Sequence, residues 1–329
     1  MEVRLLGKKG MFLTFISIAI IAAVIIIFTP SDINLKKDMS SIKTRTSRVN
    51  DYVLDLENVY LERALQSSGT KTIMSLILYM DKTDSFLTDI DANFTEVLLK
   101  GTIGGTPIDD ITGQNIMKDN TYINWINRII NISRYMFNID TSFDIHGIKI
   151  YQVRPWLVNV EANISFMVST ETASWAKNSV IKTEIGIEKF YDPYYLVNTN
   201  GAYANKIRKS GTISDEWNVD KVKDFIRDGN YTHWENSNAP SFLMRFTNDI
   251  SPSSCCGIES LVNPNNPAIS NQDTSYADYL YWSTTPDCDS FTLYSINNIN
   301  AEFPNFKLDP SHVTKYNLAD EAQQICPLL

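Results

Sequence analysis

Histidine is scarce in this 329-residue chain, and none of its three histidines lies in a recognisable catalytic pattern. His146, His233 and His312 are far apart, and none stands beside a nucleophile signature. A helical HExxH, a GxSxG elbow and a glycine-rich phosphate loop are all absent. We therefore expect each histidine to be an ordinary surface or turn residue. The sequence predicts no catalytic residue, no metal ligand and no cofactor.

Cysteine is absent from the first three quarters of the chain, and the four present are Cys255, Cys256, Cys288 and Cys326. Structural zinc sites usually take ligands in pairs two to four residues apart, whereas here two cysteines are adjacent and two are solitary. An even number of cysteines favours two disulfides in an oxidising compartment. We expect the adjacent pair to take separate partners, Cys288 and Cys326, in an order that the sequence leaves open.

Positive charge is in deficit. The chain has 29 basic and 38 acidic residues. The first 30 residues hold three basic residues and one acidic residue, so residues 31–329 have a formal net charge of 26 minus 37, or −11. An acidic surface argues against nucleic acid as a partner and against binding flat on anionic lipid. It also favours solubility outside the cell.

Long apolar runs are also lacking, with one exception, which extends from Met11 to Phe28 without a charge. As a helix it spans roughly 27 Å of a hydrocarbon core about 30 Å thick. Arg4, Lys8 and Lys9 make the preceding flank positive, which places that flank in the cytoplasm. We therefore predict a single-pass protein of the cell membrane that contacts the bilayer through residues 11–28, with its C-terminal ectodomain outside.

Three processing fates are open for this segment. A secretory signal peptide has a shorter apolar region and small residues at its cleavage site, unlike Phe28-Thr29-Pro30. An uncleaved signal anchor needs only the apolar run and the positive flank. The third fate follows from a resemblance: Lys8-Lys9-Gly10 before an apolar helix is similar to the class III signal sequence of archaeal type IV pilins and pilin-like proteins.

The pilin-like resemblance implies a specific processing site. In that family a dedicated peptidase cuts after the glycine, here Gly10, and leaves Met11 as the new N-terminus. Many members carry a glutamate five residues after the cut, where this chain has Phe15. That departure bears on assembly into a filament, not on cleavage.

A helical stalk is predicted after the apolar run, with Ser31 as N-cap and Gly69 as the residue that stops it. Its apolar positions alternate in steps of four and three, which is typical of a seam that packs on another helix. The seam comprises Leu35, Met39, Ile42, Thr46, Val49, Val53, Leu56 and Tyr60. The partner of this 35–60 seam is either a helix of another chain, by self-association, or the protein's own domain.

Helical segments are predicted next at 73–80, 85–100 and 120–138, separated by glycines and Pro107. Asp89 to Asn93 begins like a calcium-binding loop, because its oxygen ligands alternate. The required glycine is Phe94, however, and the closing glutamate is Lys100. We therefore interpret this stretch as a charged helix face.

At Thr141 the pattern changes to period two, which predicts strands at 148–154, 156–169 and 179–190, the last two forming a hairpin. An edge segment with a turn at 194–203, a helix at 219–227 and further strands at 241–247, 258–262, 277–282 and 290–296 follow. The predicted class is α+β. Its parts are residues 1–30 (flank and transmembrane helix), 31–69 (stalk), 70–140 (helical subdomain) and 141–329 (mainly antiparallel β ectodomain).

Four N-x-S/T sequons are candidate glycosylation sites of an exoplasmic domain: Asn93, Asn131, Asn163 and Asn230. The ectodomain is rich in tyrosine and tryptophan, which could line a glycan-binding surface but suit a core equally. These features favour a non-enzymatic surface protein, structural or adhesive, that self-assembles or binds a partner protein or surface glycan. The alternative is an anchored ectoenzyme that hydrolyses an envelope polymer or glycan, with two carboxylates facing each other across a cleft.

Overall fold

The computed structural model describes residues 32–109, 113–171, 173–212, 216–235, 238–270, 272–283 and 292–326. The described residues form helices and antiparallel sheets, so the α+β class is confirmed. The predictions for the apolar run 11–28 and for cleavage between Gly10 and Met11 lie outside these residues. Within the described ranges, no helix combines the length and the apolar character that a membrane span requires.

The chain divides into two compact units, which we describe separately. One holds residues 1–54 and 171–173, and the other holds 55–170 and 174–329. Most of the described part of the first unit is helix α2, whose full range is Asp32–Asp55. The second unit contains all the strands and the remaining helices.

The predicted seam is buried at three positions and fails at Thr46 and Tyr60. Val49, Val53 and Leu56 are buried, at 9%, 7% and 0% exposure, whereas Thr46 is exposed and Tyr60 is 47% exposed. At Tyr60 the reason is the π-helical turn η1, Leu56–Tyr60, which precedes α3, Leu61–Thr83. A π turn inserts one residue, which rotates the following helix by about 100°. Leu61 therefore takes the buried place that a regular α-helix would have given to Tyr60.

The prediction that Gly69 stops the helix is wrong, because Gly69 lies in the middle of α3. A Cβ at this position would lie 2.8 Å from Ile185 Cδ1 on the sheet. Glycine here allows a close approach of helix to sheet, and the neighbouring small residues Ser68 and Thr72 are fully buried. Packing, not helix termination, explains the residue.

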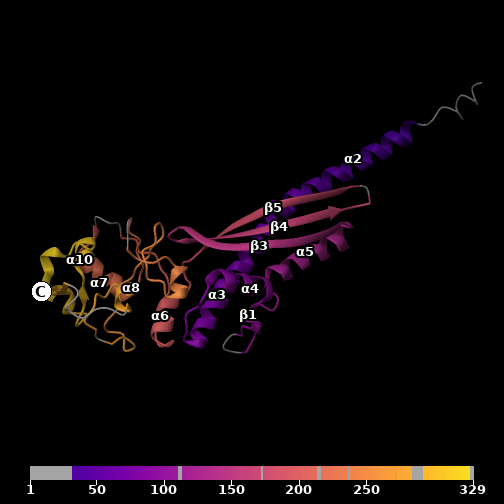
Figure 1. Ribbon diagram of the computed structural model, residues 1–329. Coiled ribbons are helices and arrows are strands. Elements are labelled where there is room, and N and C mark those ends of the chain that lie inside the picture. The colour runs from indigo at the N-terminus through magenta and orange to yellow at the C-terminus, as the bar shows by residue number, and fades with distance from the viewer. Residues whose placement is uncertain are drawn as a thin grey trace, which may run out of the picture. The chain divides into compact units, whose positions relative to one another are not determined.

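Three long strands form an antiparallel sheet in the order β3, β4, β5 (Figure 1): Asp140–Arg154, Leu157–Ser169 and Ser174–Gly186. The predicted hairpin is confirmed, since Leu157 pairs with Gly186 and Ser169 with Ser174. The change to period two at Thr141 coincides with the start of β3 at Asp140, whereas the predicted strand 148–154 covers only the second half of β3. Alternate residues of β4, from Val158 to Val168, are buried on one face of the sheet.

Helices cover that face of the sheet, with α3 against β5 and α4 and α5 against β3 (Figure 1). Helix α4, Ile90–Lys100, starts at the N-cap Asp89, whose carboxylate accepts a hydrogen bond from Ala92 N at 3.0 Å. Asp89 is therefore a helix cap, consistent with the helix-face interpretation. Two short strands, β1 (Thr102–Ile103) and β2 (Thr106–Pro107), and helix α5 (Tyr122–Phe137) complete this layer.

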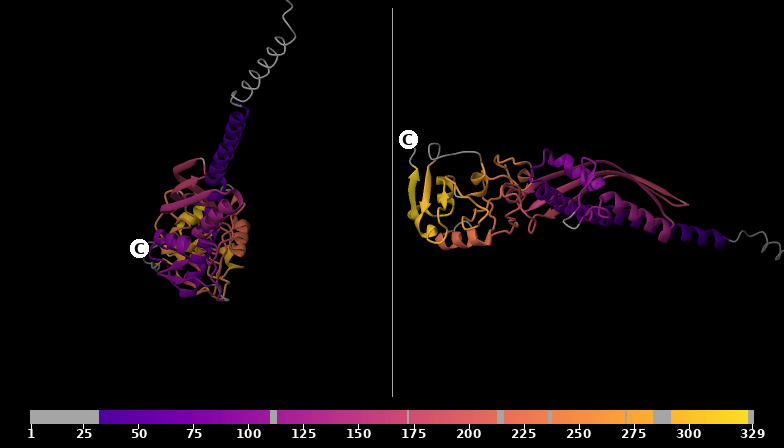
Figure 2. Two further views of the ribbon diagram at one scale, coloured as in Figure 1. Left: turned by 90° about the vertical axis from the view of Figure 1, so that its right-hand side faces the viewer. Right: turned by 90° about the horizontal axis from the view of Figure 1, so that it is seen from below.

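The remainder of the second unit consists of short elements and long connections. Its helices are α6 (Pro193–Asn198), α7 (Val219–Asp228), η3 (Met244–Thr247), α8 (Asp278–Tyr281), α9 (Asn297–Asn300), α10 (Pro310–Lys315) and η4 (Ala319–Glu321). Its strands are β6 (Leu293–Ile296), β7 (Lys307–Leu308) and β8 (Ala322–Cys326), ordered β7, β6, β8 and drawn in yellow in Figure 2.

Several strand predictions for this region are wrong. The expected edge segment 194–203 begins with α6, and the expected strand 277–282 is mostly α8. The expected strands 241–247 and 258–262 contribute only single bridges, such as Ser241 with Gly257 and Leu261 with Ala277. The helix at 219–227 is confirmed as α7. Aromatic and β-branched residues misled the prediction because they are core residues of irregular segments here.

Candidate functional site

A buried arginine organises the irregular region. Arg245, on η3, has no exposed surface, and its Nη1 lies 2.7 Å from Asp192 Oδ2 and 2.9 Å from Asp278 Oδ2. Both carboxylates are also fully buried. Asp192 is the N-cap of α6 and Asp278 is the first residue of α8, so one guanidinium holds together the starts of two helices.

Each carboxylate of this cluster is bonded by further donors. Tyr231 Oη donates to Asp192 Oδ2 at 2.8 Å, and Ser260 Oγ donates to Asp278 Oδ2 at 2.9 Å. Burial would lower the pKa of Arg245, but the two carboxylates hold it well above its ordinary value. Burial raises the pKa of Asp278 in spite of the arginine. Since a buried charge is tolerated only when it is paired and hydrogen-bonded, the site is a closed ionic network.

A second buried cluster surrounds Glu259. Its Oε1 accepts hydrogen bonds from Tyr316 Oη and Trp234 Nε1, each at 2.9 Å. Its Oε2 lies 3.4 Å from His312 Nε2 and 3.5 Å from Lys315 Nζ. The other imidazole nitrogen, Nδ1, is 2.5 Å from Asp309 Oδ2. A protonated imidazole can donate to both carboxylates at once.

The charges of this second cluster are mutually stabilised. Burial alone would lower the pKa of His312, but Glu259 and Asp309 raise it to about 9. Burial would raise the pKa of Glu259, but His312 and Lys315 lower it to about 2. His312 is fully buried, so the prediction that it is a surface or turn residue is wrong. His146 is exposed on β3, and His233 is half-buried with its Nδ1 2.7 Å from Gly257 O.

The two clusters adjoin along the backbone, because Ile258 O accepts a hydrogen bond from Arg245 Nη2 and the next residue is Glu259. Aromatic rings pack beside the second cluster, with Trp217 and Trp234 each in contact with Tyr316. Arg245, Glu259 and His312 all have no exposed surface, so substrate cannot reach them without local opening. The network therefore ties the loops of this region together.

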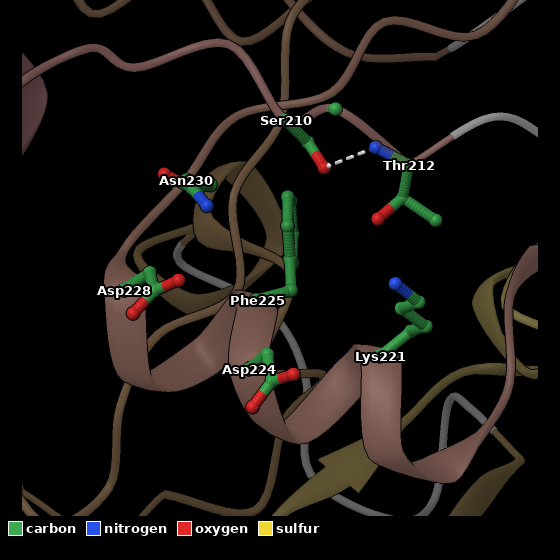
Figure 3. A pocket seen from close by; sticks show the side chains of 8 residues that line it. Ser210, Thr212, Lys221, Asp224, Phe225, Asp228 and Asn230 are labelled. Carbon is green, nitrogen blue, oxygen red and sulfur yellow. Dashed lines mark hydrogen bonds between the residues drawn. The ribbon is translucent and has the colours of Figure 1, made fainter.

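An open, polar pocket of about 370 Å³ lies beside α7 (Figure 3). Phe225 rises from the helix toward Ser210, with Asp228 and Asn230 on one side and Lys221 and Thr212 on the other. Phe225 as a whole is only 2% exposed, and its ring packs against Trp217 at a centroid distance of 5.1 Å. Little aromatic surface is thus left for a sugar to stack on.

The carboxylates of this pocket do not have the arrangement expected of a glycan hydrolase. Asp224 and Asp228 come from successive turns of one helix, and Asp224 is bonded to Arg227 Nη1 at 2.6 Å. A hydrolase needs two carboxylates that flank the scissile bond from opposite sides. Within the described ranges, no group of three or more histidine, cysteine or acidic residues is placed to hold a metal ion.

The structure corrects the predicted pairing of the cysteines. Cys255 and Cys256 form a disulfide with each other, so they do not take separate partners. Their S–S bond leaves neither sulfur free as a metal thiolate. Cys288 lies outside the described residues. Cys326 ends β8, where its backbone pairs with Leu293, and its side chain is not described.

The four sequons lie in different environments. Asn163 is exposed in the central strand β4 and Asn131 is exposed on α5. Asn93 is half-buried, and its Nδ2 donates to Asp89 O at 2.5 Å. Asn230 is half-buried in the pocket of Figure 3. Glycosylation at all four stays a prediction.

Comparison with known proteins adds no relative. No family model, no curated protein and no solved structure matches this chain.

Proposed function

We propose that the protein is a single-pass, membrane-anchored surface protein with a structural or adhesive role, processed like a pilin. The observation that supports this most is the helical run α2, η1 and α3, which extends from Asp32 to Thr83 and begins four residues after the apolar segment. Residues 11–28 contact the bilayer, the N-terminal flank is cytoplasmic, and the folded domain is outside. At about 1.5 Å per residue, α2 alone is about 36 Å long, enough to hold a domain away from a membrane.

The interior of the folded domain supports a passive role. Its buried ionisable groups bond with one another, and the pocket beside α7 is open and polar. Catalytic groups need access to substrate as well as perturbed pKa values, and Arg245 and Glu259 have no exposed surface. Paired charges that solvent does not reach suit a structural or adhesive domain.

Membrane topology and processing are tested by two measurements on the full chain. A tag after Leu329 should be cleaved by protease added to intact cells, because the positive flank retains Met1 inside. Mass spectrometry of the mature N-terminus should find Met11. Protection of the tag would contradict the proposed orientation. A mature chain that begins at Met1 would be consistent with an uncleaved anchor and would contradict pilin-like processing.

A matched pair of glycine variants identifies the cleavage site. Gly10→Val should abolish removal of the first ten residues, since the family's peptidase requires glycine before the cut. Gly7→Val changes a glycine three residues away and should leave processing intact. Equal processing of both variants would show that another enzyme, or none, acts on this segment.

We propose that self-association uses the membrane-proximal part of the seam, Leu35, Met39 and Ile42. Met39→Asp combined with Ile42→Asp should reduce the mass of the detergent-solubilised complex measured by sedimentation. Ser47→Asp combined with Asn50→Asp adds the same charge at exposed positions of α2 and should not change the mass. A monomeric wild-type chain would contradict self-association.

A further inference from the structure

The two cysteines of the Cys255–Cys256 disulfide differ in their accessibility to solvent. Cys255 is exposed, and its Sγ lies 3.7 Å from Gln152 O at the end of β3. Cys256 has no exposed surface. A reagent from solution can therefore approach this bond only from the side of Cys255.

The backbone around the buried member is held in place. Cys256 N donates to Ser253 Oγ at 3.1 Å, and Ser253 N donates to Ala239 O at 3.1 Å. A Cβ on Gly257 would lie 2.3 Å from Ala239 O, so only glycine fits this approach. These contacts fix Cys256 while Cys255 faces solvent.

We propose that Cys255–Cys256 is a thiol–disulfide exchange site whose ligand is the thiolate of an external dithiol. The thiolate attacks Cys255 Sγ, the bond between the two cysteines breaks, and Cys256 leaves as a thiolate that takes a proton from water. The second thiol of the dithiol then attacks the mixed disulfide and displaces the Cys255 thiolate, which is also protonated. The protein gains two electrons and two protons, and the dithiol becomes a disulfide.

Adjacency of the two cysteines selects a dithiol over a monothiol. After the first attack, the Cys256 thiol remains next to the mixed disulfide and can re-form the original bond by expelling the incoming thiol. A monothiol adduct is therefore short-lived, whereas a dithiol completes the second step intramolecularly. Cys256 acts as the resolving residue and Cys255 as the acceptor.

Reduction should loosen a limited segment. The residues just after the pair are tied to the buried network, since Ile258 N donates to Pro240 O at 3.1 Å and Glu259 N donates to Thr232 O at 3.0 Å. The residues just before it, such as Pro252, are more exposed. We therefore expect the segment 251–256 to gain mobility while residues from Gly257 onward stay ordered.

The experiment compares two variants of the full chain in detergent, each of which lacks one cysteine of the pair and keeps Cys288 and Cys326. Cys256→Ser leaves the accessible Cys255, and Cys255→Ser leaves the buried Cys256. On incubation with oxidised glutathione, peptide mapping should find the glutathionyl adduct on Cys255 at least about tenfold faster than on Cys256, because exposure controls thiol reactivity. Equal rates at the two positions would overturn the proposal.

Wild-type protein supplies an independent measurement if either variant fails to fold. Native dithiothreitol treatment should reduce Cys255 and Cys256, as shown by alkylation mapping, and should increase amide hydrogen exchange within 251–256 only. Glutathione at the same thiol concentration should leave no lasting adduct. Resistance of the bond to dithiothreitol without denaturant, or mapping that joins Cys255 to Cys288 or Cys326, would refute exchange at this site.

Discussion

The sheet region, residues 55–186, and the irregular region, residues 187–326, solve the same problem in different ways. The first buries its backbone polar groups in strands of 13 to 15 residues, packed on long helices. Among the described residues of the second, the longest element is the ten-residue α7, so ladders and helices satisfy fewer backbone groups. Buried side chains such as Arg245 and Asp192 form hydrogen bonds with those backbone groups instead. In this protein, buried charges tie the irregular region together, whereas apolar faces pack the sheet region.

The strongest test of this comparison is to remove the central cation. Arg245→Met leaves the buried carboxylates of Asp192 and Asp278 without their neutralising cation, and we expect a loss of about 3 to 5 kcal/mol in the free energy of unfolding. Hydrogen exchange should rise in the irregular region first. Thermal or denaturant unfolding of the ectodomain measures the loss.

The control for that variant is an arginine in an exposed ion pair. Arg227 bonds Asp224 and Glu302 with its side chain about half exposed, so Arg227→Met should cost less than about 1 kcal/mol. If the two variants lost the same stability, the buried network would not be what holds the irregular region together.

A matching disruption of the sheet region is Leu76→Ala. Leu76 is fully buried on α3, and truncation of such a leucine costs about 2 to 5 kcal/mol through lost burial and the cavity left behind. We expect the increase in hydrogen exchange to centre on α3 and β5. An increase in hydrogen exchange confined to residues 187–326 would contradict the idea that different interactions stabilise the two regions.

The pH dependence of stability distinguishes the two regions, because His312 belongs to the irregular one. Its pKa is about 9 in the folded protein and about 6.5 when unfolded, so its contribution is full below pH 6.5 and is lost as the pH rises toward 9. We expect a decrease on the order of 2 kcal/mol across that interval. Glu259, with its pKa lowered to about 2, adds an acid limb on which stability falls as the pH drops below about 4.5.

Unfolding curves at pH 6 and pH 9 check this expectation. His312→Gln should be less stable than wild type at pH 6. Its free energy of unfolding should fall much less than that of wild type between pH 6.5 and 9. A wild-type protein with the same stability at both values would exclude a charged His312 from the folded state.

The smallest expected effect concerns two helix caps, one in each region. Asp89 is exposed and caps α4, so Asp89→Ala should cost about 1 kcal/mol. Asp192 caps α6 and also binds Arg245, so Asp192→Ala should cost clearly more. Equal losses in denaturant melts would reduce Asp192 to an ordinary cap.

The sequence predicts the sheet region far better than the irregular one, for a physical reason. The alternation in Val180 to Glu188 and the apolar face of the segment 120–138 are local signals, and both elements exist. The partners of Arg245, at 53 and 33 residues' separation, are not local and leave no periodic trace. The vicinal disulfide was missed because strain was expected in the peptide between two bridged adjacent cysteines, and this argued for separate partners. His312 was misjudged because a lone histidine carries no mark of its buried carboxylates.

The π-helical turn η1 accommodates one extra residue within the long helical run. Val49, Val53 and Leu56 are buried on one face of the helix, and a regular α-helix would place Tyr60 on that same face. The face that contacts the sheet begins at Leu61 instead. Deletion of exposed Asn58 would bring the two faces into alignment, and the turn would become ordinary α-helix. Deletion of exposed Met74, more than three turns farther along α3, would instead rotate a long part of that helix by about 100° relative to the sheet. The same helix thus tolerates a change of length near η1 and not in the middle of α3.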